Sequence, residues 1–239
     1  MLKMYMRGVA EIPAIQEVAV EQLLGRPLNP YEKRYAPQRL FICGLIAVPF
    51  QFSRVAVIGT RQPSPEGLAF VKKLVKKLSD NRVIIVSGLA RGIDTAAHRE
   101  AIRCGGQTVA VLGTPLTRFY PPENKELQLQ IMSQHLAISQ FPENHITRRR
   151  DFILRNRTMA LISDATVIVE AGETSGSLSQ GWETLRLGRP LFISPIILDR
   201  RLKWPQSMMN YGARVLSDVE ELLDELPAYD FRLEKIIKT

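Results

Sequence analysis

Short apolar runs alternate with amphipathic stretches through most of the chain. Residues 55–58, 83–86 and 109–112 are runs of valine, isoleucine, alanine and leucine, a pattern typical of strands buried on both faces of a parallel sheet. A glycine-containing turn and a segment with helical spacing of apolar residues follow each run. Strands that alternate with helices in this way predict an α/β fold with a doubly wound, mostly parallel sheet and right-handed crossovers.

The same alternation continues toward the end of the chain. The helix after the first strand should begin at Ser64, a capping residue that a proline follows. Its lysines lie between the apolar positions and should form a solvated face rather than a DNA contact. Further elements are expected as strands at residues 166–169, 190–193 and 214–216, helices at 178–187 and 218–226, and a loop at 204–205.

Residues 1–36 differ from the rest and are expected to form a short helical appendage. Apolar residues between positions 11 and 24 have helical spacing, and a glycine and two prolines then interrupt it. Residues 37–239 are expected to form the main domain.

The turns after the first three strands should meet at one edge of the sheet. They comprise residues 59–61, 87–94 and 113–114. Ligands of doubly wound sheets bind outside the carboxyl ends of the strands, so these turns are the candidate binding edge. Their spacing does not match Gly-x-Gly-x-x-Gly, and neither a dinucleotide nor any other cofactor is predicted.

The turn after the second strand carries the strongest candidate. Ser87 and Gly88 end the strand, and Gly92 permits a sharp turn or a close approach to a ligand. Asp94 is suited to cap the next helix, whose free amides attract phosphate, and Arg91 adds a fork-shaped cation. Taken alone, these residues fit a turn without a ligand equally well.

An arginine-rich segment provides further candidates. Residues 145–157 hold five arginines, and Arg155, Asn156 and Arg157 are expected at a helix start near the sheet. Basic side chains gathered there suit phosphates. Phe152 could stack a base, but its place is expected in the core.

A second phosphate cradle is expected after the fourth strand of the main domain. Residues 170–177 are rich in glycine and hydroxyl groups and precede a helix. Backbone amides and hydroxyls at such a turn bind anions, which makes Ser175, Gly176 and Ser177 candidate contacts.

The composition favours a polyanionic partner. The chain of 239 residues has a formal net charge of +8, which favours association with nucleic acid. Cys43 and Cys104 have neither metal-ligand nor disulfide spacing, which indicates a reducing cytoplasm. No apolar run suits a signal peptide or a membrane span. We therefore expect a cytoplasmic protein that does not contact the membrane.

Neither catalysis nor metal binding is predicted. The three histidines have no cysteine or carboxylate at metal-ligand spacing, and His98 is expected on a helix surface or in support of a turn. No nucleophile and base stand in a recognisable arrangement. A binding protein without turnover is the expectation.

Six motifs occur in order between about residues 37 and 193. Together they resemble the DNA-processing protein A (DprA/Smf) family. The motifs are Val-Ile-Gly-Thr-Arg (57–61), Ser-Gly-Leu-Ala-Arg-Gly-Ile-Asp-Thr-Ala-Ala-His (87–98), Ala-Val-Leu-Gly-Thr (110–114), Tyr-Pro-Pro-Glu-Asn (120–124), Arg-Asn-Arg (155–157) and Glu-Ala-Gly-Glu-Thr-Ser-Gly-Ser-Leu (170–178).

The resemblance implies a Rossmann-like domain that binds single-stranded DNA without sequence preference. It also implies a homodimer that loads a RecA-type recombinase onto DNA during natural transformation. It marks Arg61, Arg91 and Arg157 as the best DNA contacts, with glycine and serine residues of the turns supplying amides. The full set of candidate DNA or phosphate contacts is Gly59, Arg61, Ser87, Gly88, Arg91, Gly92, Gly113, Arg155, Asn156, Arg157, Ser175, Gly176 and Ser177.

The sequence departs from the family pattern and leaves two alternatives. The chain is short at both ends, so neither a helical N-terminal domain nor a C-terminal winged helix is expected. It is also similar to nucleoside-monophosphate phosphoribohydrolases: Arg155 and Met159 match part of one motif, residues 170–176 fit the other poorly, and the catalytic glutamate would be Glu173 or Glu183. A nucleotide-sensing module without catalysis would instead bind a mononucleotide with little dependence on strand length.

Overall fold

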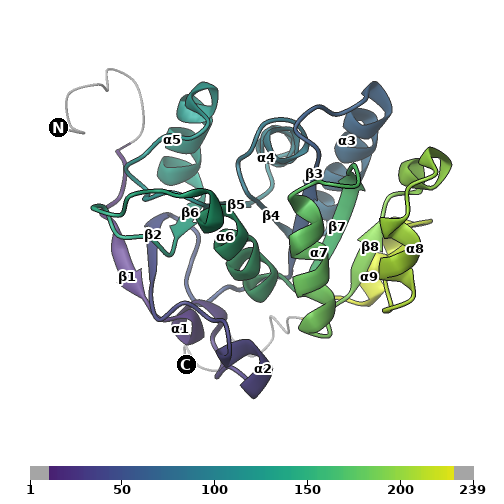
Figure 1. The fold of residues 1–239 in the computed structure, drawn as a ribbon. Helices are drawn as coiled ribbons and strands as arrows, with labels where there is room; N and C mark the ends of the chain where they lie inside the picture. Colours follow the sequence, from purple (N-terminus) through teal and green to yellow (C-terminus); the bar gives the residue numbers. More distant parts are fainter. Residues whose placement is uncertain (1–10, 229–239) are drawn as a thin grey trace, which may run out of the picture.

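The apolar runs of the sequence form neighbouring strands of one sheet. The computed structural model describes residues 11–228, and within this range nine strands pair in the order β1-β2-β6-β5-β4-β3-β7-β8-β9 (Figure 1). The strands are β1 (Gln16–Val18), β2 (Leu40–Gly44), β3 (Arg54–Gly59), β4 (Ile84–Ser87), β5 (Thr108–Leu112), β6 (Leu136–Ser139), β7 (Ala165–Glu170), β8 (Leu191–Ile193) and β9 (Arg214–Val215).

Helices cover both faces of this sheet (Figure 1). Within the described range none of them is long and apolar enough to cross a membrane. They are α1 (Val20–Leu24), α2 (Pro30–Lys33), α3 (Pro65–Asp80), α4 (Ile93–Arg103), α5 (Lys125–Gln134), α6 (Arg149–Ile162), α7 (Ser177–Arg186), α8 (Trp204–Met209) and α9 (Val219–Asp224), with short 3-10 turns at Pro122–Asn124 and Pro195–Arg200.

The sheet is doubly wound and mostly parallel, as the sequence predicts. From the central strand β3 the chain passes to β4, β5 and β6 on one side, and α6 then crosses over to β7, β8 and β9 on the other. These seven strands pair in parallel, whereas β2 runs antiparallel to β1 and β6. The strand order therefore reverses between β3 and β7, where doubly wound sheets bind their ligands.

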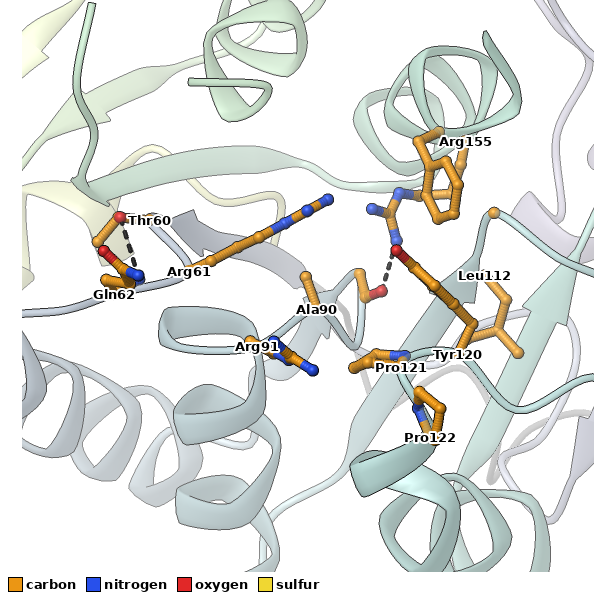
Figure 2. Close-up of a pocket in the computed structure, with 13 residues that line it drawn as sticks. Thr60, Arg61, Gln62, Ala90, Arg91, Leu112, Tyr120, Pro121, Pro122 and Arg155 are labelled. Atoms are coloured by element: carbon orange, nitrogen blue, oxygen red, sulfur yellow. Dashed lines mark hydrogen bonds between the residues drawn. The ribbon is translucent and has the colours of Figure 1, made fainter. Parts of the chain in front are cut away.

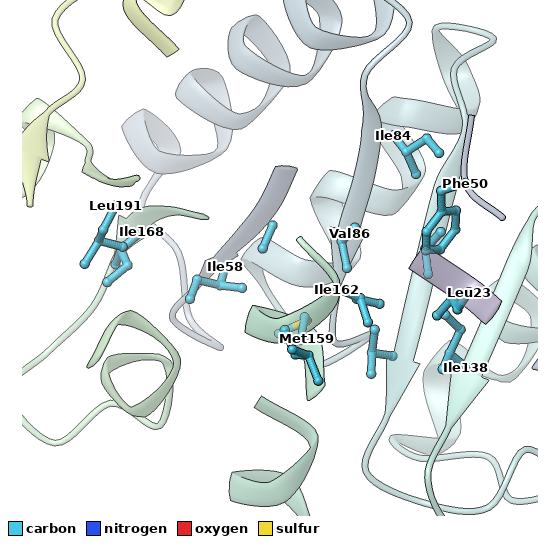
Figure 3. Close-up of a cluster of buried hydrophobic side chains, with 14 of the residues drawn as sticks. Leu23, Phe50, Ile58, Ile84, Val86, Ile138, Met159, Ile162, Ile168 and Leu191 are labelled. Carbon is cyan, nitrogen blue, oxygen red and sulfur yellow. The ribbon is translucent and has the colours of Figure 1, made fainter. Parts of the chain in front are cut away.

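Alternate residues of β3 show why its apolar run is a strand. Val55 and Val57 pack with α3 and α4, whereas Ala56 and Ile58 pack with α6 on the opposite face. Figure 3 shows the hydrophobic cluster that includes Ile58, in which Met159 of α6 lies near the sheet residues. A strand with both faces covered needs apolar residues at every position, which the run 55–58 supplies.

Helix α3 agrees with the prediction from its capping residue. The Ser64 hydroxyl accepts a hydrogen bond from the Gly67 amide at 3.1 Å, and Pro65 occupies the first turn. Most apolar positions of the helix are buried and its lysines are exposed, as a solvated face requires.

The N-terminal segment corrects one expectation. The helix predicted between residues 11 and 24 is confined to α1, because Gln16–Val18 instead forms β1 and pairs with β2. Leu23 of α1 is fully buried in the core cluster of Figure 3. The helical spacing covers only a short stretch, and the backbone of Gln16–Val18 instead pairs with the otherwise open edge of β2. The division at residue 36 stays a prediction, and residues 1–10 and 229–239 lie outside the described range.

Two smaller expectations were wrong: the loop at 204–205 and the placement of His98 on a helix surface. The tryptophan and proline at 204–205 begin α8 rather than form a loop, since proline fits the first turn of a helix. His98 is completely buried in α4, where its Nδ1 lies 2.7 Å from the Thr108 hydroxyl. Burial lowers the pKa of His98 to about 3, so this histidine is neutral and belongs to the core.

A buried carboxylate fastens the N-terminal segment to the main sheet. Glu32 of α2 is 3% exposed and accepts hydrogen bonds from Arg26, from the Asn29 amide and from Arg189. Arg189 also donates to the carbonyl of Ala160 at the end of α6. Hydrogen bonds from Arg26 are the main cause that lowers the pKa of Glu32 to about 2, and Asn29 and Arg189 contribute.

The variant Glu32→Gln should lose about 2 kcal/mol in free energy of unfolding at pH 7, because hydrogen bonds to a charged group contribute about 1.5–3 kcal/mol and both Arg26 and Arg189 lose their charged partner. The pKa of Glu32 lies below its ordinary value of 4.5 in the folded protein. Its stabilising effect is therefore complete above about pH 5 and disappears as the pH falls toward 2. Urea denaturation at several pH values measures this, with Glu126→Gln on the exposed face of α5 as control. A difference that does not shrink at low pH would contradict the assignment.

Candidate functional site

Two cavities lie along the carboxyl ends of the central strands. The first, called here the β5 cavity, has a volume of about 430 Å³ and extends from the turn after β3 to the turn after β5 (Figure 2). The second, the α7 cavity, has a volume of about 510 Å³ and extends from the turn after β3 to the start of α7. The two share the wall residues Thr60, Arg61, Ala90, Phe152 and Arg155.

The turn after β4 is held by its own aspartate. Helix α4 begins at Ile93 with Gly92 as its N-cap, so the prediction of Asp94 as the cap was wrong. The Asp94 carboxylate instead accepts hydrogen bonds from the amides of Gly88 at 3.1 Å and Ala90 at 3.4 Å. These amides are therefore already paired within the loop.

Gly92 is required where two turns touch. Its φ is +79°, and a Cβ at this position would overlap the carbonyl oxygen of Thr60. The Ile93 amide donates to that same carbonyl at 3.1 Å. Only glycine fits this conformation and this close approach, so the turns after β3 and β4 form one rigid surface.

Arg155 lies beneath that surface. Helix α6 begins at Arg149, which places Arg155 in its second turn rather than at the predicted helix start. Its side chain is 7% exposed, and Nη1 donates to the carbonyls of Gly88 and Val111. A Cβ on Gly88 would overlap the guanidinium, so glycine is needed here for packing.

Burial opposes the charges of both Arg155 and Asp94. It lowers the pKa of Arg155 and raises that of Asp94, and the attraction between the two groups counteracts both shifts. The positive charge of Arg61 lowers the pKa of Arg155 further. An anion placed between Arg61 and Arg155 would relieve this repulsion.

Two exposed arginines flank the β5 cavity. Arg61 extends across the opening toward Arg155 in Figure 2, and no carboxylate among residues 11–228 forms an ion pair with it. Arg91 is 63% exposed and pairs with Glu123 of the 3-10 turn Pro122–Asn124. Arg61 can therefore bind a phosphate without losing an ion pair, whereas Arg91 must first separate from Glu123.

An aromatic pair forms the far wall of the β5 cavity. The rings of Tyr120 and Phe152 lie 5.3 Å apart between centroids and are inclined at 51°. Phe152 was expected in the core, but it lines both cavities and covers Gly113, whose Cβ would meet the ring at 2.6 Å. Tyr120 enters the sequence analysis only within the motif at residues 120–124. Its one signal in the sequence is an aromatic residue beside two prolines, just before the 3-10 turn Pro122–Asn124.

The start of α7 forms the wall of the α7 cavity. Ser175, Gly176 and Ser177 all line it. Asn156 of α6 donates to the Gly176 carbonyl at 3.0 Å and to the Ser179 hydroxyl at 2.8 Å. This bridge fixes the turn before α7, whose N-terminus carries the positive end of the helix dipole.

The structure brings most of the predicted contacts together. Ser87 does not line either cavity, since its fully buried hydroxyl donates to the Val57 carbonyl at 2.7 Å. Arg157 lies outside both, with its guanidinium 4.7 Å from the Tyr35 ring centroid. The predicted residues that line the two cavities are Gly59, Arg61, Gly88, Arg91, Gly113, Arg155, Asn156, Ser175, Gly176 and Ser177.

The glutamates considered for hydrolysis do not line either cavity. Glu173 accepts a hydrogen bond from the Lys203 amide at 2.5 Å, and Glu183 pairs with Arg186 on the same helix. Asp94 is the acidic residue in the α7 cavity wall, where its carboxylate accepts hydrogen bonds from the Gly88 and Ala90 amides. Among residues 11–228, no three His, Cys, Asp or Glu side chains are placed to hold a metal ion.

The family is decided by comparison with known sequences. The model of a family described as DNA recombination-mediator protein A matches residues 27–227. The chain belongs to this family. A DNA processing protein DprA from Streptococcus pneumoniae is 38% identical over 80% of this chain and 67% of the relative, and the Smf protein of Escherichia coli is 33% identical over 90% and 56%. The chain spans between 44% and 68% of the length of the curated relatives that it matches.

Solved structures agree with the family. The crystal structure of DprA from Streptococcus pneumoniae has a TM-score of 0.77 and 33% identity, covering 90% of this chain and 75% of that one. A structure of DprA from Helicobacter pylori, described for its single-stranded DNA binding mode, has a TM-score of 0.71 and 25% identity, covering 83% and 92%. A molybdenum cofactor binding protein from Rippkaea orientalis, at 16% identity and a TM-score of 0.52, shares the fold alone.

Arg155 and Arg61 should have separable effects on stability. Arg155→Met leaves Asp94 and two carbonyls without their buried partner, and should lower the free energy of unfolding by about 3 kcal/mol. Arg61→Met removes an exposed side chain and should change it by less than about 0.5 kcal/mol. Urea denaturation compares the two. Equal losses would contradict the distinction between a buried support and an exposed contact.

Proposed function

We propose that this protein binds single-stranded DNA along the edge formed by the β5 and α7 cavities. The observation that carries the proposal is Arg61, an exposed cation without a carboxylate partner in the described chain, which lies between the two cavities and beside the Tyr120 and Phe152 pair. Family membership supports this function, as does the DNA binding described for the Helicobacter pylori relative.

The chemistry of the edge suits a strand without its complement. Arg61 and Arg91 can hold phosphate groups, and the start of α7 adds hydroxyls and the helix dipole. The ring faces of Tyr120 and Phe152 can stack bases of any kind. Unpaired bases expose the faces that this contact needs, so a strand should bind better than a duplex.

Family membership supports a proposal for the role in the cell. We infer that a homodimer of this protein acts in the cytoplasm as a recombination mediator, which loads a RecA-type recombinase onto single-stranded DNA during DNA uptake. Turnover is not expected, because no nucleophile and base stand in a recognisable arrangement in the sequence. RecA-dependent strand exchange, measured with and without this protein, tests the loading step.

The first test of binding is fluorescence anisotropy of a labelled single strand at several salt concentrations. The affinity should fall as salt rises, with a log-log slope of about −0.7 for each phosphate neutralised. Arg61→Ala should weaken binding about tenfold and make the slope shallower by about one phosphate. Competition by duplex DNA should be weak, and AMP should not displace the strand.

Arg157→Ala is the matched control for Arg61→Ala. Arg157 is also an arginine from a candidate motif, but it packs on Tyr35 outside both cavities, so its removal should leave the affinity and the slope unchanged. If Arg157→Ala weakens binding as much as Arg61→Ala does, the strand does not bind specifically along the two cavities and the proposed surface is wrong. Displacement by AMP would instead favour a nucleotide-binding function.

Glu123 should compete with DNA for Arg91. Its carboxylate forms an ion pair with that guanidinium, and both side chains are exposed. Glu123→Gln frees Arg91 and should tighten single-strand binding about threefold at low salt, with the gain lost at high salt. The double variant Glu123→Gln with Arg91→Ala is the control. Tighter binding that persists in the double variant would show that Arg91 is not the phosphate contact.

A further inference from the structure

A further cavity, called here the α4 groove, lies between α3 and α4. These helices pack against each other on one face of the sheet. The groove has a volume of about 610 Å³, and its walls along the helices include Leu68, Lys72, Ala96, Arg99 and Arg103. The arginines at positions 61 and 91, labelled in Figure 2, line both this groove and the β5 cavity. The two cavities therefore adjoin, and the groove leads away from the candidate binding edge.

The rim of the α4 groove is positively charged. Lys72 of α3 and Arg99 of α4 are exposed, and no carboxylate among residues 11–228 forms an ion pair with either. Arg103 follows one turn after Arg99 and donates to both carboxylate oxygens of Glu100, which is 5% exposed. Side chains four residues apart share one face of a helix, so Arg99 and Arg103 form a row of cations along α4.

Lys72 approaches this row from the opposite helix. The hydrogen bonds from Arg103 are the main cause that lowers the pKa of Glu100, and the positive charge of Lys72 contributes. Lys72 thus differs from Lys73, which is exposed on the same helix but does not line the groove. The solvated face expected from the sequence therefore includes one lysine that is placed to contact a ligand.

The floor of the α4 groove is apolar. The partly buried side chains of Pro63, Leu68 and Ala96 line it, and none of them can form a hydrogen bond. Such a floor cannot read the edges of bases, but it suits the carbon atoms of deoxyribose. Cations on the rim suit phosphates, whose contacts position a nucleic acid without reading its sequence. The groove therefore matches a sugar-phosphate backbone.

We propose that the α4 groove holds the backbone of the DNA strand beyond the β5 cavity, with Lys72, Arg99 and Arg103 as phosphate contacts. The inference rests on the proposed binding of single-stranded DNA. Continuity favours DNA over an acidic protein segment as the occupant, because Arg61 and Arg91 belong to both cavities. A strand already held by these two residues presents its next phosphates to the groove at a high effective concentration.

The proposal predicts that affinity depends on strand length. A strand of about 4 nucleotides fills only the cavities at the strand ends, whereas one of about 16 nucleotides also reaches the groove. Longer strands gain additionally from overlapping binding registers, but that statistical gain is the same for every variant. The informative quantity is therefore the ratio of the two affinities, compared between variants.

The test removes the two unpaired cations of the groove in the double variant Lys72→Gln with Arg99→Gln. Fluorescence anisotropy of thymine-only strands measures the affinity at about 0.15 M salt, where exposed charges act only over about 8 Å. The double variant should bind the longer strand about tenfold more weakly. Its log-log salt slope for that strand should be shallower by about 1.4, because two phosphate contacts are lost. The affinity for the shorter strand should change less than about twofold.

The double variant Lys33→Gln with Lys73→Gln is the matched control. It removes the same net charge from two exposed positions that line neither the α4 groove nor the cavities at the strand ends. Its affinities for both strands should equal those of the unmodified protein. A loss equal to that of the groove variant would show an effect of net charge alone and overturn the inference.

A second kind of strand tests whether the groove contacts the backbone. It joins about 4 thymine nucleotides to about 12 abasic units. Because the proposed contacts are phosphates, this strand should keep most of the gain in affinity that the longer thymine strand shows, and the groove variant should lose that gain. An extension that improves binding only when it carries bases contradicts the backbone contact.

The possible failures are distinguishable. A ratio of long-strand to short-strand affinity that is the same in the unmodified protein and the groove variant overturns the inference, while strand binding that Arg61→Ala weakens leaves the proposed function intact. An unmodified protein that binds no strand overturns the proposed function. Polyglutamate identifies the other class of occupant: if it binds saturably, if the groove variant loses this binding, and if strand length has no effect, the groove belongs to an acidic protein segment and the inference is wrong.

Discussion

The binding edge depends on one buried guanidinium. Arg155 reaches from α6 to the carbonyls of Gly88 and Val111, which lie at the ends of β4 and β5. These bonds fix the two strand ends and the helix relative to one another. The charge is tolerated in the interior because the negative charge of Asp94 balances it and two carbonyl oxygens accept hydrogen bonds from the guanidinium. The glycine at position 88 follows from the same contact, since a side chain there would displace the guanidinium.

This buried support leaves the exposed cations free for another purpose. Arg155 cannot leave its carbonyl partners without disrupting the turn, so it contributes to a ligand mainly through its field. Arg61 stands in front of it without a carboxylate partner in the described chain, and the two like charges repel. A phosphate between them reduces that repulsion and needs no existing ion pair to be broken. Arg91, in contrast, must exchange Glu123 for its ligand, which makes its contribution smaller and more sensitive to salt.

Much of the fold and the location of the edge could be predicted from the sequence. Runs such as 55–58 have the composition of strands covered on both faces, and topology then places their following turns together. The start of α6 was placed too late because arginines at 148–150 hide its apolar pattern. The usable signal was Asp151, which accepts a hydrogen bond from the Arg148 amide in the first turn. Burial of polar residues such as His98 and Gln180 depends on tertiary packing, which periodicity cannot show.

The two cavities extend the candidate binding edge to both sides of β3. They share the wall formed by Arg61, Phe152 and Arg155 but open on different sides of the carboxyl end of β3. On the β5 side the aromatic pair presents ring faces, which do not distinguish bases. On the α7 side the hydroxyls of Ser175 and Ser177 at the start of α7 suit an anion. Because the strand order reverses between β3 and β7, the turns diverge at this point, and the same phosphate contact can serve both sides.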